Sequence, residues 1–524
     1  MHTPKATRRD MVLGFARLAG LSGAMAAMQG LGLVAEAGVY SGPPKPPGSA
    51  GRGKKVIVLG AGIAGLVSAW ELRKAGFEVA VLEARHRPGG RVWTVRGGDV
   101  MTHDHVPAQR VSFDAGHFFN VGAARIPACH HGVHAYCREF GVPLEVQVNV
   151  NADARYVSAN VRNGLPLEDR QVRHDVRGGV SELLAKAINK GALDDELTAL
   201  DRERLLDFLA QYGALGEGYA YSGSDRLGYD VEPTVHGAPS SIRKSIPLTE
   251  LIQEPGWAFQ LTFGDQLYQQ TAMLHPVGGM DAIPYAFAGR LKSEIRYGVQ
   301  VTHLKRTESG VHVLYSQKNG LTGTMEADYA VCTLPFSVLK TIRCDLSAPV
   351  QSAVNSMVYD ASCKVAWQSP RFWETEDHIY GGLSNVDSRC NMAWYPSYGF
   401  DMKDGVLVGC YNFTGQAEPF AAQSLKAQYE ESRASVDRIH PGKGHLLSRP
   451  VSVNWAHVPH SMGAWAEEGP DTNHDTPGVR AVIAGDGPIA FAGQHLSPLG
   501  AWMEAAIRSA HHAVAGIYAR ASAA

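Results

Sequence analysis

Residues 54–94 read KKVIVLGAGIAGLVSAWELRKAGFEVAVLEARHRPGGRVWT, and this stretch decides the fold of the 524-residue chain. An apolar run at 56–59 suits a buried parallel strand, and Gly60, Gly62 and Gly65 follow it in a G-x-G-x-x-G pattern. The first glycine permits a tight turn, the second lets the backbone approach a pyrophosphate, and the third lets a helix pack closely on the strand. The pattern therefore predicts a dinucleotide-binding unit.

The residues after the glycines complete this unit. A helix over 63–75 would point its N-terminal N–H groups and the positive end of its dipole at the phosphates, and Gly76 would end it. A second strand at 78–82 leads to Glu83, where a carboxylate can accept hydrogen bonds from a ribose 2′-hydroxyl. We therefore expect a dinucleotide that lacks a 2′-phosphate.

A second glycine turn follows. The sequence continues as Glu83-Ala84-Arg85 and then Pro88-Gly89-Gly90-Arg91-Val92, which would add amide groups and a fixed cation beside the diphosphate. This extension resembles the E-A-R…G-G-R motif of the flavin-dependent amine oxidases, among which the bacterial L-amino acid oxidases are the most similar. The resemblance implies FAD and an α/β fold: a discontinuous, Rossmann-like FAD-binding domain of the GR2 type, an α+β substrate-binding domain and a helical insertion.

The expected domains follow the order of apolar runs along the chain. We expect the FAD-binding domain to combine residues 54–134, 271–344 and 476–524. A helical insertion would occupy 135–270, and a strand-rich substrate-binding domain would occupy 345–475.

The first 53 residues differ in composition from the rest. Arg8 and Arg9 precede a weakly apolar, Ala/Gly-rich run and an A-x-A site at 35–37, which is typical of a twin-arginine export signal over residues 1–38. A Pro/Gly/Ser-rich linker at 39–53 follows. We expect a periplasmic or secreted protein without stable membrane insertion; an uncleaved amphipathic helix on a cytoplasmic protein is the alternative.

Composition and charge exclude several classes of function. A net charge of −2 gives no electrostatic basis for binding nucleic acid. The seven cysteines are scattered without a C-x-x-C pair, which predicts neither a disulfide framework nor a metal site. His130 and His134 are spaced so that they could hold a metal, but a solvated helix face is the simpler interpretation, and we expect no metal.

The segment 120–127 carries the first substrate candidate. Its residues Gly122, Ala123, Ala124 and Arg125 resemble the G-x-M-R-I-P motif of L-amino acid oxidases, with Ala124 where methionine is usual. The resemblance implies that Arg125 grips the substrate carboxylate, and the planar guanidinium suits a bidentate hold. A structural ion pair is the alternative role for this arginine.

Two further candidates lie on expected strands. Tyr395, in a Y-P-S sequence, resembles the tyrosine that donates a second hydrogen bond to the carboxylate in the same family. Lys364 lies in an apolar strand, where a lysine costs several kcal/mol unless it is hydrogen-bonded or paired. By resemblance Lys364 holds a water against the flavin and assists reoxidation by oxygen; a lysine that reaches solvent from the strand edge is the alternative.

The C-terminal block 491–504 combines a glycine turn with a helix start. The resemblance places the helix N-terminus and Met503 at the pyrimidine side of the flavin, where the dipole favours the anionic reduced ring. Gln494 stands where the family usually has an acidic residue. Trp465 and Trp502 match the aromatic pair of the substrate site, to which Ala501 also belongs. In the monoamine branch of the family that the chain resembles, a cysteine shortly before the last helix binds FAD covalently. No cysteine lies between residues 454 and 503 here, so the resemblance implies non-covalent FAD.

These motifs define a set of expected FAD contacts. They are Gly60, Gly62, Ile63, Ala64, Gly65, Glu83, Ala84, Arg85, Gly90, Arg91, Gly122, Ala123, Ala124, Arg125, Val301, Gly493, Gln494, Trp502 and Met503.

The resemblance therefore implies FAD-dependent oxidative deamination of L-amino acids by oxygen, which yields 2-oxo acids, ammonia and hydrogen peroxide. An amide-forming amino acid 2-monooxygenase, a polyamine or monoamine oxidase and a flavin-retaining binding protein are the alternatives. His236 or His275 could act as a base, although a hydrogen-bonded loop histidine is the simpler interpretation. The tryptophans favour bulky aromatic or aliphatic substrates, and a homodimer or higher homo-oligomer is a further expectation.

Overall fold

The computed structural model describes residues 40, 42–46, 48, 51–270, 272–466 and 476–523. The predicted export signal at 1–38 lies outside these residues. By its internal contacts the chain divides into Met1–Pro43 and Pro44–Ala524, and every element described below belongs to the second unit.

A five-stranded parallel sheet carries the glycine-rich turn. Its strands come from three separate segments of the chain, which confirms the discontinuous α/β fold. In spatial order they are β14 (Ile295–Tyr297), β2 (Glu78–Glu83), β1 (Lys55–Leu59), β18 (Tyr329–Cys332) and β27 (Ile489–Phe491).

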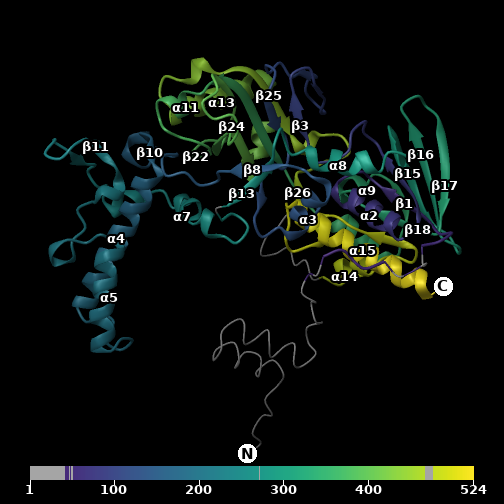
Figure 1. Cartoon of the computed structure of the whole chain (residues 1–524), viewed down its shortest axis with the longest axis horizontal. Helices are drawn as coiled ribbons and strands as arrows, with labels where there is room; N and C mark the ends of the chain where they lie inside the picture. Colours follow the sequence, from purple (N-terminus) through teal and green to yellow (C-terminus); the bar gives the residue numbers. More distant parts are fainter. Residues whose placement is uncertain are drawn as a thin grey trace, which may run out of the picture. The chain divides into compact units, whose positions relative to one another are not determined.

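Alternate residues of β1 face opposite sides of this sheet, as the two-residue period of a strand requires. Val56 and Val58 pack in the core that includes α2 (Ile63–Lys74) and α15 (Met503–Ala523), whereas Ile57 packs against a second sheet. Helices α2 and α15 therefore cover one face of the parallel sheet (Figure 1). The second sheet covers the other face, together with the helices α9 (Phe336–Leu339), α10 (Ala348–Ser356) and α14 (Pro477–Ala484). The strands of that second sheet are β17 (Thr322–Ala327), β16 (Val311–Gln317), β15 (Val299–Arg306) and β19 (Arg343–Asp345).

The turn after β1 requires its glycines. Gly60 has a φ of 98°, in the left-handed region that side chains disfavour. A Cβ at Gly65 would lie 2.0 Å from the carbonyl oxygen of Gly60, so only glycine lets α2 pack this closely on the strand. At the other end of α2, Gly76 with a φ of 85° turns the chain towards β2.

A seven-stranded sheet forms the framework of the second large core. Neighbouring strands are antiparallel except β9 and β22, which pair in parallel. Their order is β10 (Leu167–Glu168), β9 (Arg155–Val157), β22 (Gly382–Val386), β23 (Met392–Tyr395), β24 (Asp404–Phe413), β21 (Ser362–Pro370) and β25 (Ser448–Asn454).

The remaining strands are short. Three of them form a sheet in the order β7 (Ile126–Pro127), β13 (Met273–Pro276) and β8 (Leu144–Gln147). The others form four pairs: β3 (Thr94–Arg96) with β6 (Phe118–Asn120), β4 (Val100–Met101) with β5 (Gln109–Arg110), β11 (Tyr229–Val231) with β12 (Ser241–Ile242), and β20 (Tyr359–Asp360) with β26 (Trp465–Ala466).

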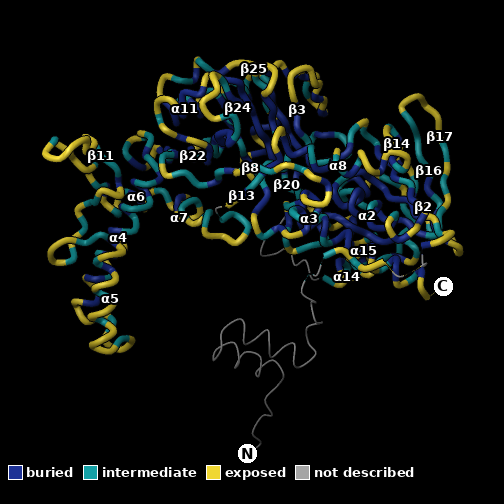
Figure 2. Tube along the Cα trace, viewed as in Figure 1, coloured by how far each residue is buried: buried dark blue, intermediate teal, exposed yellow. Residues whose placement is uncertain are grey.

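The segment between β10 and β13 is largely helical. Its two long helices, α4 (Asp169–Asn189) and α5 (Ala199–Tyr212), pack against each other through a small apolar cluster, and α5 is mostly exposed (Figure 2). Thr198 begins α5 in a capping box with Asp201. The shorter α6 (Leu248–Leu251) and α7 (Gly256–Leu261) follow.

The remaining helices lie between strands of the two cores. They are α3 (His131–Phe140), α8 (Ala282–Arg290), α9 (Phe336–Leu339), α10 (Ala348–Ser356), α11 (Phe372–Thr375), α12 (Ala417–Ala421), α13 (Leu425–Ile439) and α14 (Pro477–Ala484). Within the described ranges, none of the helices has both the length and the apolar character needed to span a membrane.

Candidate functional site

A cavity of about 920 Å³ lies where the parallel sheet and the seven-stranded sheet meet. Its wall includes every expected FAD contact except Gly65. Gly65 is the third residue of α2, where it serves helix packing rather than the cavity surface. Segments far apart in sequence therefore converge on one site, as the discontinuous fold requires.

The nucleotide end of the cavity is formed by two glycine turns. Gly62 is the N-cap of α2 and provides no side-chain hydrogen bond to the first turn of the helix, so those N–H groups are available to a ligand. A Cβ on Gly62 would meet no protein atom within 4 Å and would fill ligand space instead. Gly89 lies alongside Gly62 and donates to the Ala61 carbonyl at 2.8 Å. This cradle fits a pyrophosphate.

Glu83 is held rigidly at the end of β2. It is 4% exposed, and its two carboxylate oxygens accept hydrogen bonds from the backbone N–H groups of Ala61 and Arg85, each at 2.8 Å. Arg85 in turn donates to Ser461 Oγ at 2.8 Å, and burial lowers the pKa of this arginine. The fixed carboxylate lining the cavity suits a ribose hydroxyl.

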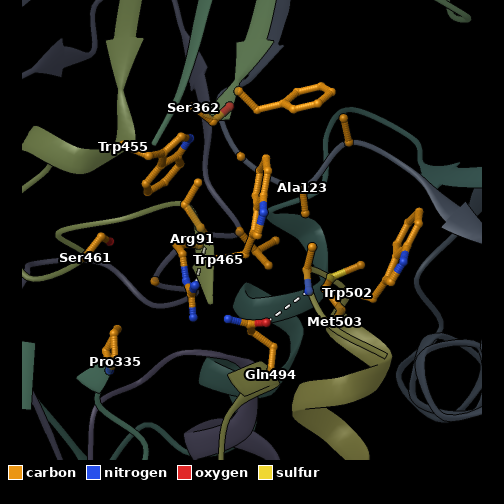
Figure 3. A pocket seen from close by; sticks show the side chains of 18 of the residues that line it. Arg91, Ala123, Pro335, Ser362, Trp455, Ser461, Trp465, Gln494, Trp502 and Met503 are labelled. Atoms are coloured by element: carbon orange, nitrogen blue, oxygen red, sulfur yellow. Dashed lines mark hydrogen bonds between the residues drawn. The ribbon is translucent and has the colours of Figure 1, made fainter. Parts of the chain in front are cut away.

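Gln494 places an unpaired donor at the centre of the site. Its Oε1 accepts the N–H of Ala501 at 3.0 Å, whereas its buried Nε2 has no hydrogen-bond partner in the part of the chain that the structure describes. In Figure 3 the amide lies between Arg91 and the start of α15 at Met503. Arg91 donates to the Ala464 carbonyl at 2.8 Å. A buried amide without a partner is costly, so this donor fits an oxygen-rich ligand such as the diphosphate or ribityl chain of FAD.

Arg125 is a cation that has no carboxylate partner among the described residues. Its Nη1 donates to Asn149 Oδ1 at 3.0 Å, and its guanidinium lies 4.8 Å from the ring centre of Trp394 and 5.7 Å from that of Trp502. Burial lowers its pKa, and within the described residues no Asp or Glu pairs with it. An arginine in this state at a cavity wall is a binding site for an anionic group.

Lys364 is buried on β21 beside this arginine. Its Nζ donates to the carbonyl oxygens of Gly122 at 2.6 Å and Asn120 at 3.3 Å, and the side chain is 4% exposed. Burial first, and then the charge of Arg125, lower the pKa of Lys364 to about 7. The lysine can therefore exchange a proton near neutral pH.

Aromatic rings enclose the space beside these two cations. Trp465 donates to Asp360 Oδ2 at 2.8 Å, and Trp502 packs edge-on to His130 at 5.0 Å. Figure 3 shows Trp465 and Trp502 with Trp455, whose indole N–H donates to the Val121 carbonyl at 3.1 Å. The rings make this part of the cavity apolar.

The structure corrects the expectation for Tyr395. Its side chain does not line the cavity and is 1% exposed, and its hydroxyl bonds to Ser384 Oγ at 2.7 Å and His440 Nε2 at 2.6 Å. Because neighbouring strand residues face opposite sides, Trp394 enters the cavity and Tyr395 points away from it. Tyr395 therefore cannot hold the same ligand as Arg125 in this arrangement.

The two histidines considered as bases also lie outside the cavity wall. His236 is exposed, whereas His275 is buried with its Nδ1 3.1 Å from the Pro276 carbonyl. The histidines at 130–134 form no metal cluster: across the described part of the chain, no group of three or more His, Cys, Asp or Glu side chains could hold a metal ion.

Several cavity residues were not predicted from the sequence. They are Asn149, Phe263, Trp394, Tyr411, Phe413 and Trp455. Alternation along β23 and β24 could have suggested the strand residues, but Asn149 lies in a loop without a motif.

Comparisons with known proteins agree with this geometry. A family model described as flavin-containing amine oxidoreductase matches residues 63–518. The flavin-dependent L-tryptophan oxidase of Lentzea aerocolonigenes is 29% identical over 502 residues, which covers 89% of this chain and 98% of that protein. An L-amino-acid oxidase of Mus musculus is 27% identical and covers 87% of this chain and 69% of its own length.

Solved structures share the architecture at lower identity. Cyclohexylamine oxidase from Brevibacterium oxydans has a TM-score of 0.60 at 17% identity, covering 89% of this chain and 99% of its own. Putrescine oxidase bound to putrescine has a TM-score of 0.59 at 19% identity with the same coverage. At these identities the likeness concerns the fold alone.

Proposed function

The chain belongs to the flavin-containing amine oxidoreductase family, and we propose that it is an FAD-dependent L-amino acid oxidase. The proposed reaction converts an L-amino acid, oxygen and water into a 2-oxo acid, ammonia and hydrogen peroxide. The observation that carries this proposal is Arg125, a cation at the cavity wall that no carboxylate of the described chain neutralises. An amino acid brings the missing carboxylate, whereas a simple amine would bring a second positive charge.

FAD would be held by the glycine turns at Gly62 and Gly90, by Glu83, and by Gln494 with the start of α15. When bound, it supplies the acceptor for two electrons from the substrate and passes them to oxygen. We propose that this FAD is non-covalent, because none of the seven cysteines lines the cavity. Acid precipitation should leave the yellow colour in the supernatant, and a coloured pellet would contradict the proposal.

The protein's own groups would position the substrate and exclude water. Arg125 would bind the carboxylate through its planar fork, while Trp465 and Trp502 enclose the rest of the amino acid. Such fixed orientation can contribute about 7–11 kcal/mol of the barrier. Lys364, with a pKa of about 7, can hold or move a proton at Nζ.

Product analysis tests the function. Purified yellow protein should form peroxide and ammonia in equal amounts with L-amino acids, and much less with D-amino acids. An amide and carbon dioxide would indicate a monooxygenase, and turnover of amines without a carboxylate would indicate an amine oxidase. Anaerobic bleaching of the flavin by an L-amino acid, with recovery in air, would exclude a binding protein without turnover.

We also propose export through the segment 1–38, based on Arg8, Arg9 and the A-x-A site at 35–37. Changing both arginines to lysine should keep the protein in the cytoplasm. Unchanged distribution between cell fractions would exclude the twin-arginine route.

A further inference from the structure

Asn149 is the direct hydrogen-bond partner of Arg125. It is 4% exposed and lies in the loop between β8 and β9. Its Oδ1 accepts from Arg125 Nη1 at 3.0 Å, and its Nδ2 donates to the carbonyl oxygen of Gln269 at 3.1 Å. Both polar atoms are therefore used, and the side-chain amide has one orientation that satisfies both bonds.

Gln269, which accepts the second hydrogen bond of Asn149, belongs to a wall of the cavity. Residues 256–269, here called the wall segment, comprise α7 and the following turn, and they contribute Phe259, Phe263 and Gln269 to the cavity lining. Phe263 also lies 5.6 Å from the Arg125 guanidinium. Asn149 thus joins the cation to the wall that faces it.

The chemistry of an amide matters at this position. A carboxylate of the same shape would accept the same bond from Arg125 but would also neutralise it, and it would repel the Gln269 carbonyl. The amide oxygen fixes one edge of the guanidinium while leaving its full charge for a ligand. The two tryptophans beside Arg125 restrain the plane of the fork without supplying a counter-charge.

We propose that Asn149 is a positioning residue that makes Arg125 selective for substrates with a free carboxylate. This inference rests on the proposed function of the same cavity. Asn149 orients the planar guanidinium of Arg125 and leaves its positive charge without a counter-charge until substrate binds. It also links carboxylate binding to the wall segment through its hydrogen bond to Gln269.

The central test is Asn149→Asp in the FAD-bound enzyme. An internal carboxylate would compete with the substrate at high effective concentration, so the KM for L-amino acids should rise about 100-fold or more. Flavin absorbance titrated with benzoate, a carboxylate without an amine, should show a similar loss of affinity. The kcat should change by less than about tenfold, because bound substrate still meets the same Trp465 and Lys364.

Two further variants complete the design. Asn149→Ala removes the aiming bond without adding charge, so KM should rise only about 3- to 10-fold. Asn163→Asp is the matched control, because Asn163 is exposed, lies outside the cavity and already has the positive φ of 54° that Asp tolerates. It should behave as wild type. Flavin content, which depends on the other end of the cavity, reports whether each variant is folded.

The outcomes separate the two proposals. If wild type oxidises L-amino acids and binds benzoate but Asn149→Asp keeps the wild-type KM, the role of Asn149 is overturned and the function stands. An Asn149→Ala variant with a KM as high as that of Asn149→Asp would also overturn it, because charge would then be irrelevant. If wild type neither oxidises amino acids nor binds benzoate, the proposed function fails and this inference fails with it.

Discussion

The hydroxyl of Tyr395 lies 2.6 Å from Nε2 of His440, inside the core behind the cavity wall. His440 Nδ1 lies 2.7 Å from Asp377, which also pairs with Arg155. Burial opposes ionisation of Asp377, but the His440 hydrogen bond and the Arg155 charge hold its pKa below the usual value. This chain of polar groups ties β23 to the end of α13 and so fixes the strand that carries Trp394 into the cavity.

Replacing Tyr395 by phenylalanine should therefore affect stability rather than substrate binding. The change leaves His440 and Ser384 buried with one partner fewer, which costs about 1–3 kcal/mol. Urea unfolding should show this loss, while KM for L-amino acids stays within about threefold of wild type. A tenfold increase in KM with unchanged stability would instead indicate that Tyr395 contacts the substrate.

Arg125→Ala should remove most activity towards amino acids. The loss in kcat/KM should correspond to about 3–5 kcal/mol, on the scale of breaking a buried charge pair. Arg125→Lys keeps the charge but loses the planar fork, so it should recover only part of the activity. Steady-state kinetics on one L-amino acid measure both variants, and near-normal turnover by Arg125→Ala would remove the carboxylate-binding argument.

Local signals were sufficient for the elements nearest the glycine turns. The predicted helix at 63–75 and strand at 78–82 correspond to α2 and β2, because apolar runs and glycines mark their ends. The helix start expected within the block 491–504 is that of α15 at Met503, and Ala501 lies before it with a φ of 63° that a helix excludes. In the expected helical insertion, the Thr198 cap marks the start of α5.

The site was harder to predict where contacts are distant in sequence. The two-residue period of β23 shows that Trp394 and Tyr395 face opposite sides, but not which side faces the cavity. Asn149 meets Arg125 only because the loop after β8 folds back on the 120–127 segment. No local pattern in the sequence encodes that approach.

Two glycines in the same motif should respond differently to alanine. A Cβ at Gly62 enters open ligand space, and its φ of −70° is acceptable, so Gly62→Ala should fold normally but bind FAD at least about tenfold more weakly. A Cβ at Gly65 would lie 2.0 Å from a backbone oxygen, so Gly65→Ala should destabilise the protein by about 1–3 kcal/mol. Flavin titration and urea unfolding distinguish the two effects. Equal FAD affinities for wild type and Gly62→Ala would show that the turn at Gly62 does not hold the pyrophosphate.

Lys364→Met should change how stability depends on pH. The pKa of Lys364 is about 7 in the folded protein against an ordinary 10.5, so between these values the unfolded chain binds one more proton and wild-type stability rises with pH. Below pH 7 both states are protonated and the full penalty of the buried charge remains. Methionine removes that penalty, so the variant's advantage in unfolding free energy should be greatest below pH 7 and shrink by up to about 1.4 kcal/mol per pH unit towards pH 10. Unfolding midpoints of both apoproteins measured from pH 6 to 10 test this, and parallel curves would mean that Lys364 keeps its proton throughout.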